Sequence, residues 1–157
     1  MAFAAMGHSE RAWDLASMIN PVNHSGSATD AATYKVEPYV MAADIYAVNP
    51  HIGRGGWTWY TGSAGWMYRL ITESLLGLRL EGDTLYFAPC FPVDWPSFKV
   101  HYRFGETVYH ITLVQSADRP EEINVIMDGA IHPEKSVKLI NDLQEHFVEL
   151  TFAAELV

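Results

Sequence analysis

The chain has 157 residues, 49% of them apolar, so it can bury the core of one ordinary domain or of two incomplete pieces. Ten lysine and arginine residues stand against 19 acidic residues, and the resulting net charge of −9 opposes binding to nucleic acid or anionic lipid. The single cysteine, Cys90, excludes an intrachain disulfide and a cysteine-based metal cluster, and it fits a reducing compartment.

The N-terminal residues predict two helices. Residues 1–7 have the character of the apolar last turns of a buried helix that stops at Gly7, so we expect the chain to start inside a larger fold. Ser9 is the expected N-cap of the next helix, which should end near Asn20 because Pro21 follows. No continuous apolar stretch of the sequence is long enough to span a bilayer.

A long connection follows the second helix. Residues 21–58 carry turn-forming residues and short apolar runs without helical period, among them SGSATDAATY and KVEPYVMAADIY. Long ordered connections of this kind are frequently functional, so this segment is a candidate wall of a site. The stretch from Ser63 to Leu76 then predicts a helix that ends at Gly77 and whose apolar face includes Trp66, which we expect to be buried.

After Gly77 the apolar residues alternate with period two. The stretch LRLEGDTLYFAP predicts a hairpin that turns at residues 81–83, and FKVHYRFGETVYHITLV predicts one that turns near Gly105 and Glu106. Three more short runs follow: INVIMDGAIHP, SVKLIND and HFVELTFA. Six or more short strands at this spacing indicate an antiparallel sandwich, so the predicted class is α+β with a boundary near residue 77.

One segment, GRGGWTWYTGSAGWMYR at residues 53–69, combines five glycines with three tryptophans and two tyrosines. Within it, Thr61 and Gly62 precede the helix that starts at Ser63, where backbone amides and the positive end of the helix dipole favour an anion. The alternative is that Thr61 only caps the helix and Gly62 only lets a tryptophan pack. The residue pattern alone favours this alternative.

Glu37 is a second candidate, because Pro38 biases it toward an extended conformation. A carboxylate held among Tyr34, Tyr39 and Tyr60 can accept hydrogen bonds from sugar hydroxyls while an aromatic ring covers the apolar face of the sugar. The alternative is a surface glutamate on an extended loop. The neighbouring aromatic and basic residues are Tyr34, Tyr39, His51, Arg54, Trp57, Trp59 and Tyr60.

Other polar residues carry weaker patterns. The histidines show no HExxH or similar spacing, so no metal site is expected, and no GxSxG motif marks a nucleophilic serine. The acidic pairs Glu121 with Glu122 and Asp142 with Glu145 are expected in solvated turns.

An ordered set of motifs resembles the C-terminal part of the inverting sugar phosphorylases related to cellobiose and chitobiose phosphorylase, glycoside hydrolase family 94. The motifs are MGHSERAWDLASMINPVNH, YKVEPYVMAADIY, GRGGWTWYTGSAGWMYR and ESLLGLRLEGDTLYFAPCFPVDWPSFKVHYRF. These motifs most resemble the sequence of the phosphorylase-like end of the cyclic β-1,2-glucan synthases. The resemblance covers residues 1–115 and fades through the last strands.

The resemblance implies that residues 1–77 are the last helices and a long loop of an (α/α)6 barrel, and that residues 78–157 are a jelly-roll-like β-sandwich. It also implies reversible phosphorolysis with inorganic phosphate as co-substrate and with no cofactor. In that reaction a carboxylic acid protonates the glycosidic oxygen while phosphate attacks the anomeric carbon from the opposite face and inverts it.

The same resemblance implies roles for six residues. Thr61 and Gly62 match the Thr-Gly that binds phosphate, and Glu37 matches a glutamate that faces the acceptor-side sugar. Trp57, Trp59 and Tyr60 would line the sugar groove. The catalytic aspartate and a phosphate-binding histidine lie upstream of the matching segment, so this chain is expected to lack the general acid.

Three hypotheses about the function remain. The first is a C-terminal fragment of a carbohydrate-active enzyme that acts on a β-glucan or β-glucoside and is inactive alone. The second is a non-catalytic carbohydrate-binding or interaction module, and the third is a remnant that folds by self-association. Expected partners are the sugar, inorganic phosphate and either the missing barrel segment or a second copy. The expected location is the cytoplasm, or attachment there to an inner-membrane protein in the full-length parent.

Overall fold

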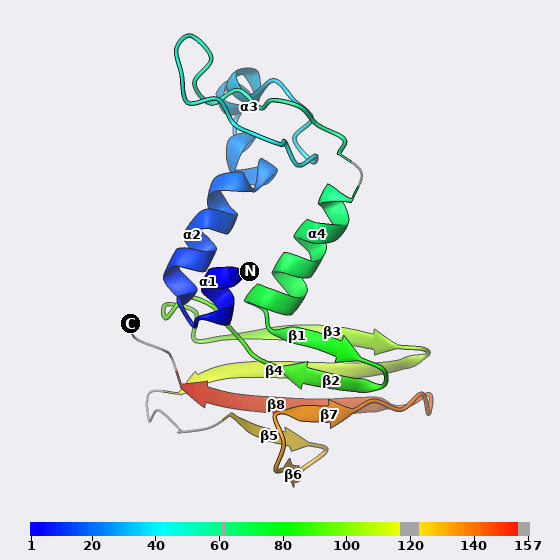
Figure 1. Ribbon diagram of the computed structural model, residues 1–157. Coiled ribbons are helices and arrows are strands. Elements are labelled where there is room, and N and C mark those ends of the chain that lie inside the picture. Colours follow the sequence, from blue (N-terminus) through cyan, green and yellow to red (C-terminus); the bar gives the residue numbers. More distant parts are fainter. Residues whose placement is uncertain (61, 117–122, 154–157) are drawn as a thin grey trace.

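A computed structural model describes residues 1–60, 62–116 and 123–153, with the helices first and the strands after them (Figure 1). The helices are α1 (Ala2–Ala5), α2 (Ser9–Ile19), the 3₁₀ helix η1 (Pro21–His24), α3 (Ala28–Tyr34), α4 (Ser63–Arg69) and the π-helix η2 (Leu70–Leu75). The strands are β1 (Leu78–Glu81), β2 (Thr84–Phe87), β3 (Ser97–Phe104), β4 (Thr107–Ser116), β5 (Asn124–Met127), β6 (Ala130–His132), β7 (Ser136–Lys138) and β8 (Glu145–Ala153). The predicted α+β class is confirmed. Among the described residues, no helix has the length and apolar character needed to cross a membrane.

The strands form two sheets that share one apolar core. The first sheet has the order β1-β2-β7, and the second has the order β3-β4-β8-β5-β6. Alternate side chains of β4 and β8 point into the core. The buried residues of this core are Leu78, Leu85, Phe87, Phe91, Tyr109, Ile111, Leu113, Val125, Val137, Leu139, Val148, Leu150 and Phe152.

The expectation of a purely antiparallel arrangement is wrong. Strands β4 and β8 pair in parallel, with His110 opposite Phe147, at the centre of the five-stranded sheet. Residues 117–144 separate the two strands in the sequence, which is a connection long enough for a parallel crossover. The alternating pattern of each strand is the same for either direction of its neighbour, so the pattern could not reveal this pairing. The hairpins predicted at residues 81–83 and near Gly105 are present.

The helices differ from the prediction in two places. His8 is the N-cap of α2, and Ser9 is its first, buried residue. Within the connection predicted to lack helical period, Ser27 caps the short helix α3 by accepting a hydrogen bond from the amide of Asp30 at 3.1 Å. This helix has only seven residues, so a local cap contributes more to it than apolar periodicity does.

Trp66 was expected to be buried, and this expectation is wrong because the side chain is 60% exposed. Helices α2 and α4 rise from the sheets, and α3 lies at their far end (Figure 1). Among the described residues, the buried contacts of α4 and η2 lie at the sheet-side end, where Leu75 meets Ala12, Ala16 and Cys90. The chain exposes 10,000 Å², whereas a compact monomer of this mass exposes about 7,900 Å².

The helices are attached to the sheets through the backbone around Cys90. The indole N–H of Trp13 donates to the Cys90 carbonyl oxygen at 2.7 Å, and the Cys90 amide donates to the Leu75 carbonyl oxygen at 3.0 Å. Gly77 lies between η2 and β1 with a φ of 72°, and the Ala88 amide donates to its carbonyl at 2.8 Å. A side chain on Gly77 would overlap the Ala88 carbonyl group.

We therefore expect Gly77→Ala to lower the free energy of unfolding by about 3 kcal/mol, because it combines left-handed backbone strain with overlap against a backbone group. Gly82→Ala is the matched control. Gly82 also has a positive φ, of 62°, but no atom lies within 4 Å of an added Cβ, so its cost should be about 1 kcal/mol. Urea denaturation measures both values, and equal losses would contradict the packing described for Gly77.

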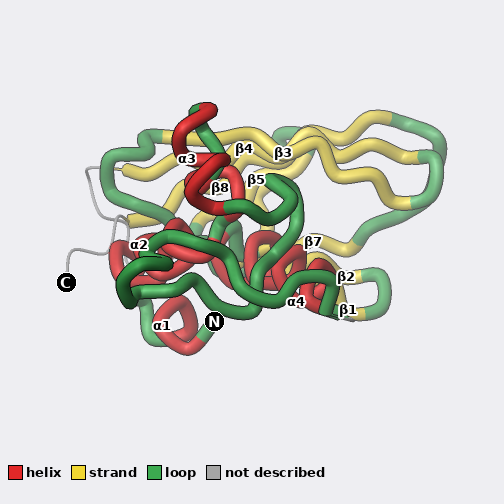
Figure 2. Tube along the Cα trace, turned by 90° about the horizontal axis from the view of Figure 1, so that it is seen from above, coloured by secondary structure: helices red, strands yellow, loops and turns green. Residues whose placement is uncertain are grey.

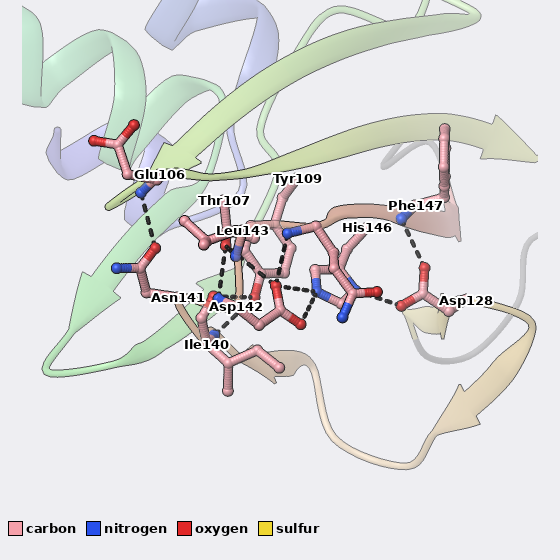
Figure 3. A network of polar contacts seen from close by, with 11 residues as sticks. Glu106, Thr107, Tyr109, Asp128, Ile140, Asn141, Asp142, Leu143, His146 and Phe147 are labelled. Atoms are coloured by element: carbon pink, nitrogen blue, oxygen red, sulfur yellow. Dashed lines mark hydrogen bonds and ion pairs between the residues drawn. The ribbon is translucent and has the colours of Figure 1, made fainter.

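A polar network joins the turn after β5, the loop before β8 and β8 itself (Figure 3). His146 lies between two carboxylates: its Nδ1 is 2.6 Å from Asp128 and its Nε2 is 3.2 Å from Asp142. The Tyr109 ring stacks on the imidazole with 4.9 Å between centroids. Asp142 was expected in a solvated turn, and it lies in a bend before β8 with 26% of its side chain exposed. It also accepts a hydrogen bond from Thr107 and lies beside His146, which is 9% exposed.

This arrangement shifts three pKa values. The hydrogen bond to Asp128 raises the pKa of His146 above its ordinary value of 6.5. The Phe147 amide lowers the pKa of Asp128, and the Gln144 amide lowers that of Asp142, both below 3.8. The His146 contribution to stability is therefore complete below pH 6.5 and is lost as the pH rises through the folded-state pKa, whereas the aspartate contributions are complete above 3.8 and are lost on acidification.

The network should stabilise the protein most between about pH 4 and 6.5. We expect the melting temperature of the wild type to fall from pH 5.5 to pH 8.5 by more than that of His146→Gln, which lacks the titrating imidazole. Thermal unfolding followed by circular dichroism gives both differences. An identical pH dependence in the two proteins would show that the His146 contacts do not contribute.

Candidate functional site

Residues 36–60 form a loop that runs from α3 to α4 and folds back on itself (Figure 2, viewed from above). Its two halves meet at an antiparallel bridge between Ile45 and Gly55. Three backbone hydrogen bonds extend this contact. They run from the amides of Tyr46, Gly56 and Ala43 to the carbonyl oxygens of Arg54, Asp44 and Trp57, at 2.9, 2.8 and 2.8 Å.

The paired glycines Gly55 and Gly56 allow this close approach. Gly55 is buried, and its amide donates to the Tyr34 carbonyl oxygen at 2.9 Å. A Cβ atom on Gly55 would overlap Val36 and approach the Tyr34 ring at 3.0 Å, and one on Gly56 would overlap the Asp44 carboxylate. Gly55 therefore leaves room for Val36 and the buried Tyr34 ring, whereas a side chain at Gly56 would displace the Asp44 carboxylate.

Glu37 is held by two donors from the other half of the loop. The indole N–H of Trp59 donates to Oε1 at 2.9 Å, and the hydroxyl of Thr58 donates to Oε2 at 3.3 Å. The Trp59 hydrogen bond is the main cause that lowers the pKa of Glu37 below its ordinary value of 4.5, so the carboxylate is ionised at neutral pH.

The aromatic surroundings of Glu37 differ from the prediction. Tyr34 is 1% exposed and stacks on the His24 ring at 5.2 Å, so its ring belongs to the support of the loop. Tyr39 is 73% exposed. The side chains that hold Glu37 are those of Thr58 and Trp59.

Three aromatic side chains in residues 57–60, the segment that donates to Glu37, are exposed. The exposed fractions are 71% for Trp57, 67% for Trp59 and 55% for Tyr60. Trp59 also has a φ of 62°, in the left-handed region that bulky residues rarely adopt. Large exposed rings beside a fixed carboxylate are suited to bind a ligand that has both apolar faces and hydroxyl groups.

The start of α4 lies next to this loop along the chain. Gly62 is its exposed N-cap and has a φ of 87°. Both the amide and the hydroxyl of Ser63 donate to the Tyr60 carbonyl oxygen, at 3.2 and 3.0 Å, which fixes the entry into the helix. Thr61, the other predicted anion-binding residue, lies outside the described residues.

Two further observations concern the predicted chemistry. Arg54 is exposed, and no salt bridge joins it to another residue that the structure describes. In the described ranges, no three histidine, cysteine, aspartate or glutamate side chains are placed to hold a metal ion.

Thr58 contacts Glu37 but was not predicted from the sequence, because the two residues lie 21 positions apart and no local pattern links them.

Comparison with known proteins gives the family. Residues 1–77 match the catalytic domain of the glycosyl hydrolase 94 superfamily. Residues 1–77 therefore belong to this superfamily. The match includes Glu37, the aromatic loop and the whole of α4 and η2.

Three relatives extend the similarity beyond residue 77. The cyclic β-(1,2)-glucan synthase NdvB of Rhizobium meliloti is 46% identical over 78% of this chain and 4% of its own length. The N,N'-diacetylchitobiose phosphorylase of Vibrio furnissii is 31% identical over 72% of this chain and 14% of its own length. The 1,2-β-oligoglucan phosphorylase of Listeria innocua is 26% identical over 84% and 13%. The chain thus spans less than a sixth of the length of each of these relatives.

We expect Gly55→Ala to open the loop, because the added Cβ overlaps Val36 and crowds the buried Tyr34 ring. Trypsin should then cleave after the exposed Arg54 at least about tenfold faster than in the wild type. The rate in each protein is first divided by the rate for the same bond in a short peptide, which corrects for the changed residue after Arg54. Gly65→Ala is the control, because no atom lies within 4 Å of an added Cβ there. Cleavage of both variants at the wild-type rate would contradict the close packing of the loop.

Proposed function

We propose that this chain forms part of a glycoside phosphorylase-type site that binds a β-glucan or β-glucoside beside inorganic phosphate. The observation that carries this proposal is the Glu37 carboxylate, which two donors fix on an exposed aromatic loop that leads directly into α4. The names of the phosphorylase relatives support the reaction type. Two relatives have names that mention 1,2-β-linked glucans, and these names suggest a β-1,2 linkage for the sugar.

On the sugar side, the ionised Glu37 accepts hydrogen bonds from sugar hydroxyls. Trp57, Trp59 and Tyr60 offer ring faces to the apolar side of the pyranose. Both kinds of contact come from one loop whose backbone is fixed by hydrogen bonds, so little conformational entropy is lost on binding.

On the phosphate side, Thr61 and Gly62 bind the anion at the start of the helix formed by α4 and η2. The helix dipole and the Thr61 hydroxyl stabilise its charge, and the exposed Arg54 is the nearest arginine before them in the sequence. Trp59 and Gly62 are three residues apart, so their Cα atoms lie within about 11 Å of each other. This span allows a sugar and a phosphate to be bound side by side.

The general acid of the reaction comes from protein outside this sequence. Phosphate carries its own negative charge, so the inverting reaction needs one acid to protonate the glycosidic oxygen and no second carboxylate to activate a nucleophile. In this proposal the chain contributes binding and orientation, and not proton transfer.

The same outside protein covers the exposed faces of the helices, as neighbouring helices of an (α/α)6 barrel or as a second copy of the chain. The supporting observation is the set of large apolar side chains exposed on these elements, because a large apolar patch on a protein surface commonly marks an interaction site. Its exposed residues are Met18, Ile19, Val22, Trp66, Tyr68 and Ile71.

Titration with inorganic phosphate followed by ³¹P NMR tests the proposal. Thr61→Val should weaken phosphate binding about tenfold, because one hydrogen bond to an anion is lost, and should change the free energy of unfolding by less than about 0.5 kcal/mol. Thr72→Val is the matched control, because the Thr72 hydroxyl donates to the Tyr68 carbonyl within the same helix.

Equal phosphate affinity in the wild type and in Thr61→Val would overturn the assignment of the phosphate site. A wild type that binds a β-1,2-linked glucose disaccharide but no phosphate would overturn the phosphorylase-type function and point to a carbohydrate-binding module.

A further inference from the structure

Trp59 has an unusual backbone that its packing does not explain. A residue with a side chain in the left-handed region is strained by about 1–2 kcal/mol, and Trp59 has a φ of 62°. Its side chain is 67% exposed, so burial of the indole does not offset this strain. The indole N–H of this strained residue donates a hydrogen bond to Glu37.

Thr58 acts on the same carboxylate from the preceding position. Its side chain donates to Oε2 while Trp59 donates to Oε1, so each oxygen of Glu37 has its own donor. Side chains of consecutive residues point to opposite faces of a regular extended strand, and both cannot then reach one carboxylate. The left-handed turn at Trp59 breaks this alternation and lets both groups converge on Glu37.

We propose that Thr58 and Trp59 are positioning residues that orient Glu37 toward a sugar hydroxyl and keep it a hydrogen-bond acceptor. This inference rests on the proposed sugar-binding role of Glu37. With both oxygens held, one lone pair on each stays available for the ligand. The indole N–H is engaged with Glu37, so Trp59 contributes to recognition through this carboxylate and through its ring face.

The lowered pKa of Glu37 fits this role, because a protonated carboxyl would donate where an acceptor is required. The proposal therefore predicts that binding of a neutral sugar weakens on acidification with the midpoint of the Glu37 titration. Loss of either donor should move that midpoint upward, toward the ordinary value of 4.5.

The test uses the full chain, ¹³C-labelled at the glutamate carboxyl carbons, with the Glu37 signal assigned by its absence in Glu37→Gln. In Trp59→Phe and in Thr58→Val we expect the Glu37 midpoint to rise. We also expect the affinity for the β-1,2-linked glucose disaccharide, measured calorimetrically at pH 7, to fall about five- to tenfold. Trp57→Phe is the control for the titration, because this variant removes an exposed indole from the same loop and leaves both donors to Glu37 in place.

The outcomes separate the two proposals. If Glu37→Gln abolishes disaccharide binding while Trp59→Phe and Thr58→Val bind with wild-type affinity and midpoint, the positioning role is overturned and the sugar-binding role of Glu37 stands. If the wild type binds no disaccharide, the proposed function fails. The titration then tests whether Thr58 and Trp59 orient the carboxylate. An unchanged Glu37 midpoint in both Trp59→Phe and Thr58→Val overturns the positioning role.

Discussion

The close contact between residues 34–44 and the glycine pair Gly55 and Gly56 is the constraint on which the candidate site depends. The loop contains one isolated bridge and no regular strand, so a sheet does not determine its shape. Its shape comes from backbone hydrogen bonds between its two halves, and from the side chains of Tyr34, Val36 and Asp44 that lie against Gly55 and Gly56. This approach brings Thr58 and Trp59 to Glu37 across 21 and 22 positions of the sequence.

The sheets support this loop through the helices: the sheets anchor the helices, and the helices connect to the loop. The sheets enclose the main core, and the contacts of Cys90 with Trp13 and Leu75 attach the helices to them. Helices α2 and α4 then carry the loop away from the sheets (Figure 1). The polar groups proposed to bind sugar and phosphate therefore lie on the helical half, which is the part that matches the glycosyl hydrolase 94 catalytic domain.

Much of the fold could be predicted because its signals are local. The turns at residues 81–83 and near Gly105 are marked by their own residues, and the helix that ends before Gly77 is marked by its stop. The parallel pairing of β4 with β8 could not be predicted, since side-chain alternation does not depend on strand direction. The apolar spacing from Ser63 to Leu76 correctly predicted a helical segment, but the burial predicted for Trp66 was wrong, because the core contacts described for this segment lie at its sheet-side end. Glu37 was predicted as a site residue from Pro38 and the family motif, whereas the contact of Thr58 with it became visible only in the folded loop.

Amide hydrogen exchange measured by NMR tests most directly whether the loop is preformed in the free chain. The amides of Ala43, Gly55 and Gly56 donate across the loop, so we expect them to exchange more slowly than in an unstructured peptide, without any sugar or phosphate present. Exchange of all three at the rate of an unstructured peptide, while the amides of β4 and β8 stay protected, would contradict the account, because Glu37 would then have no fixed donors.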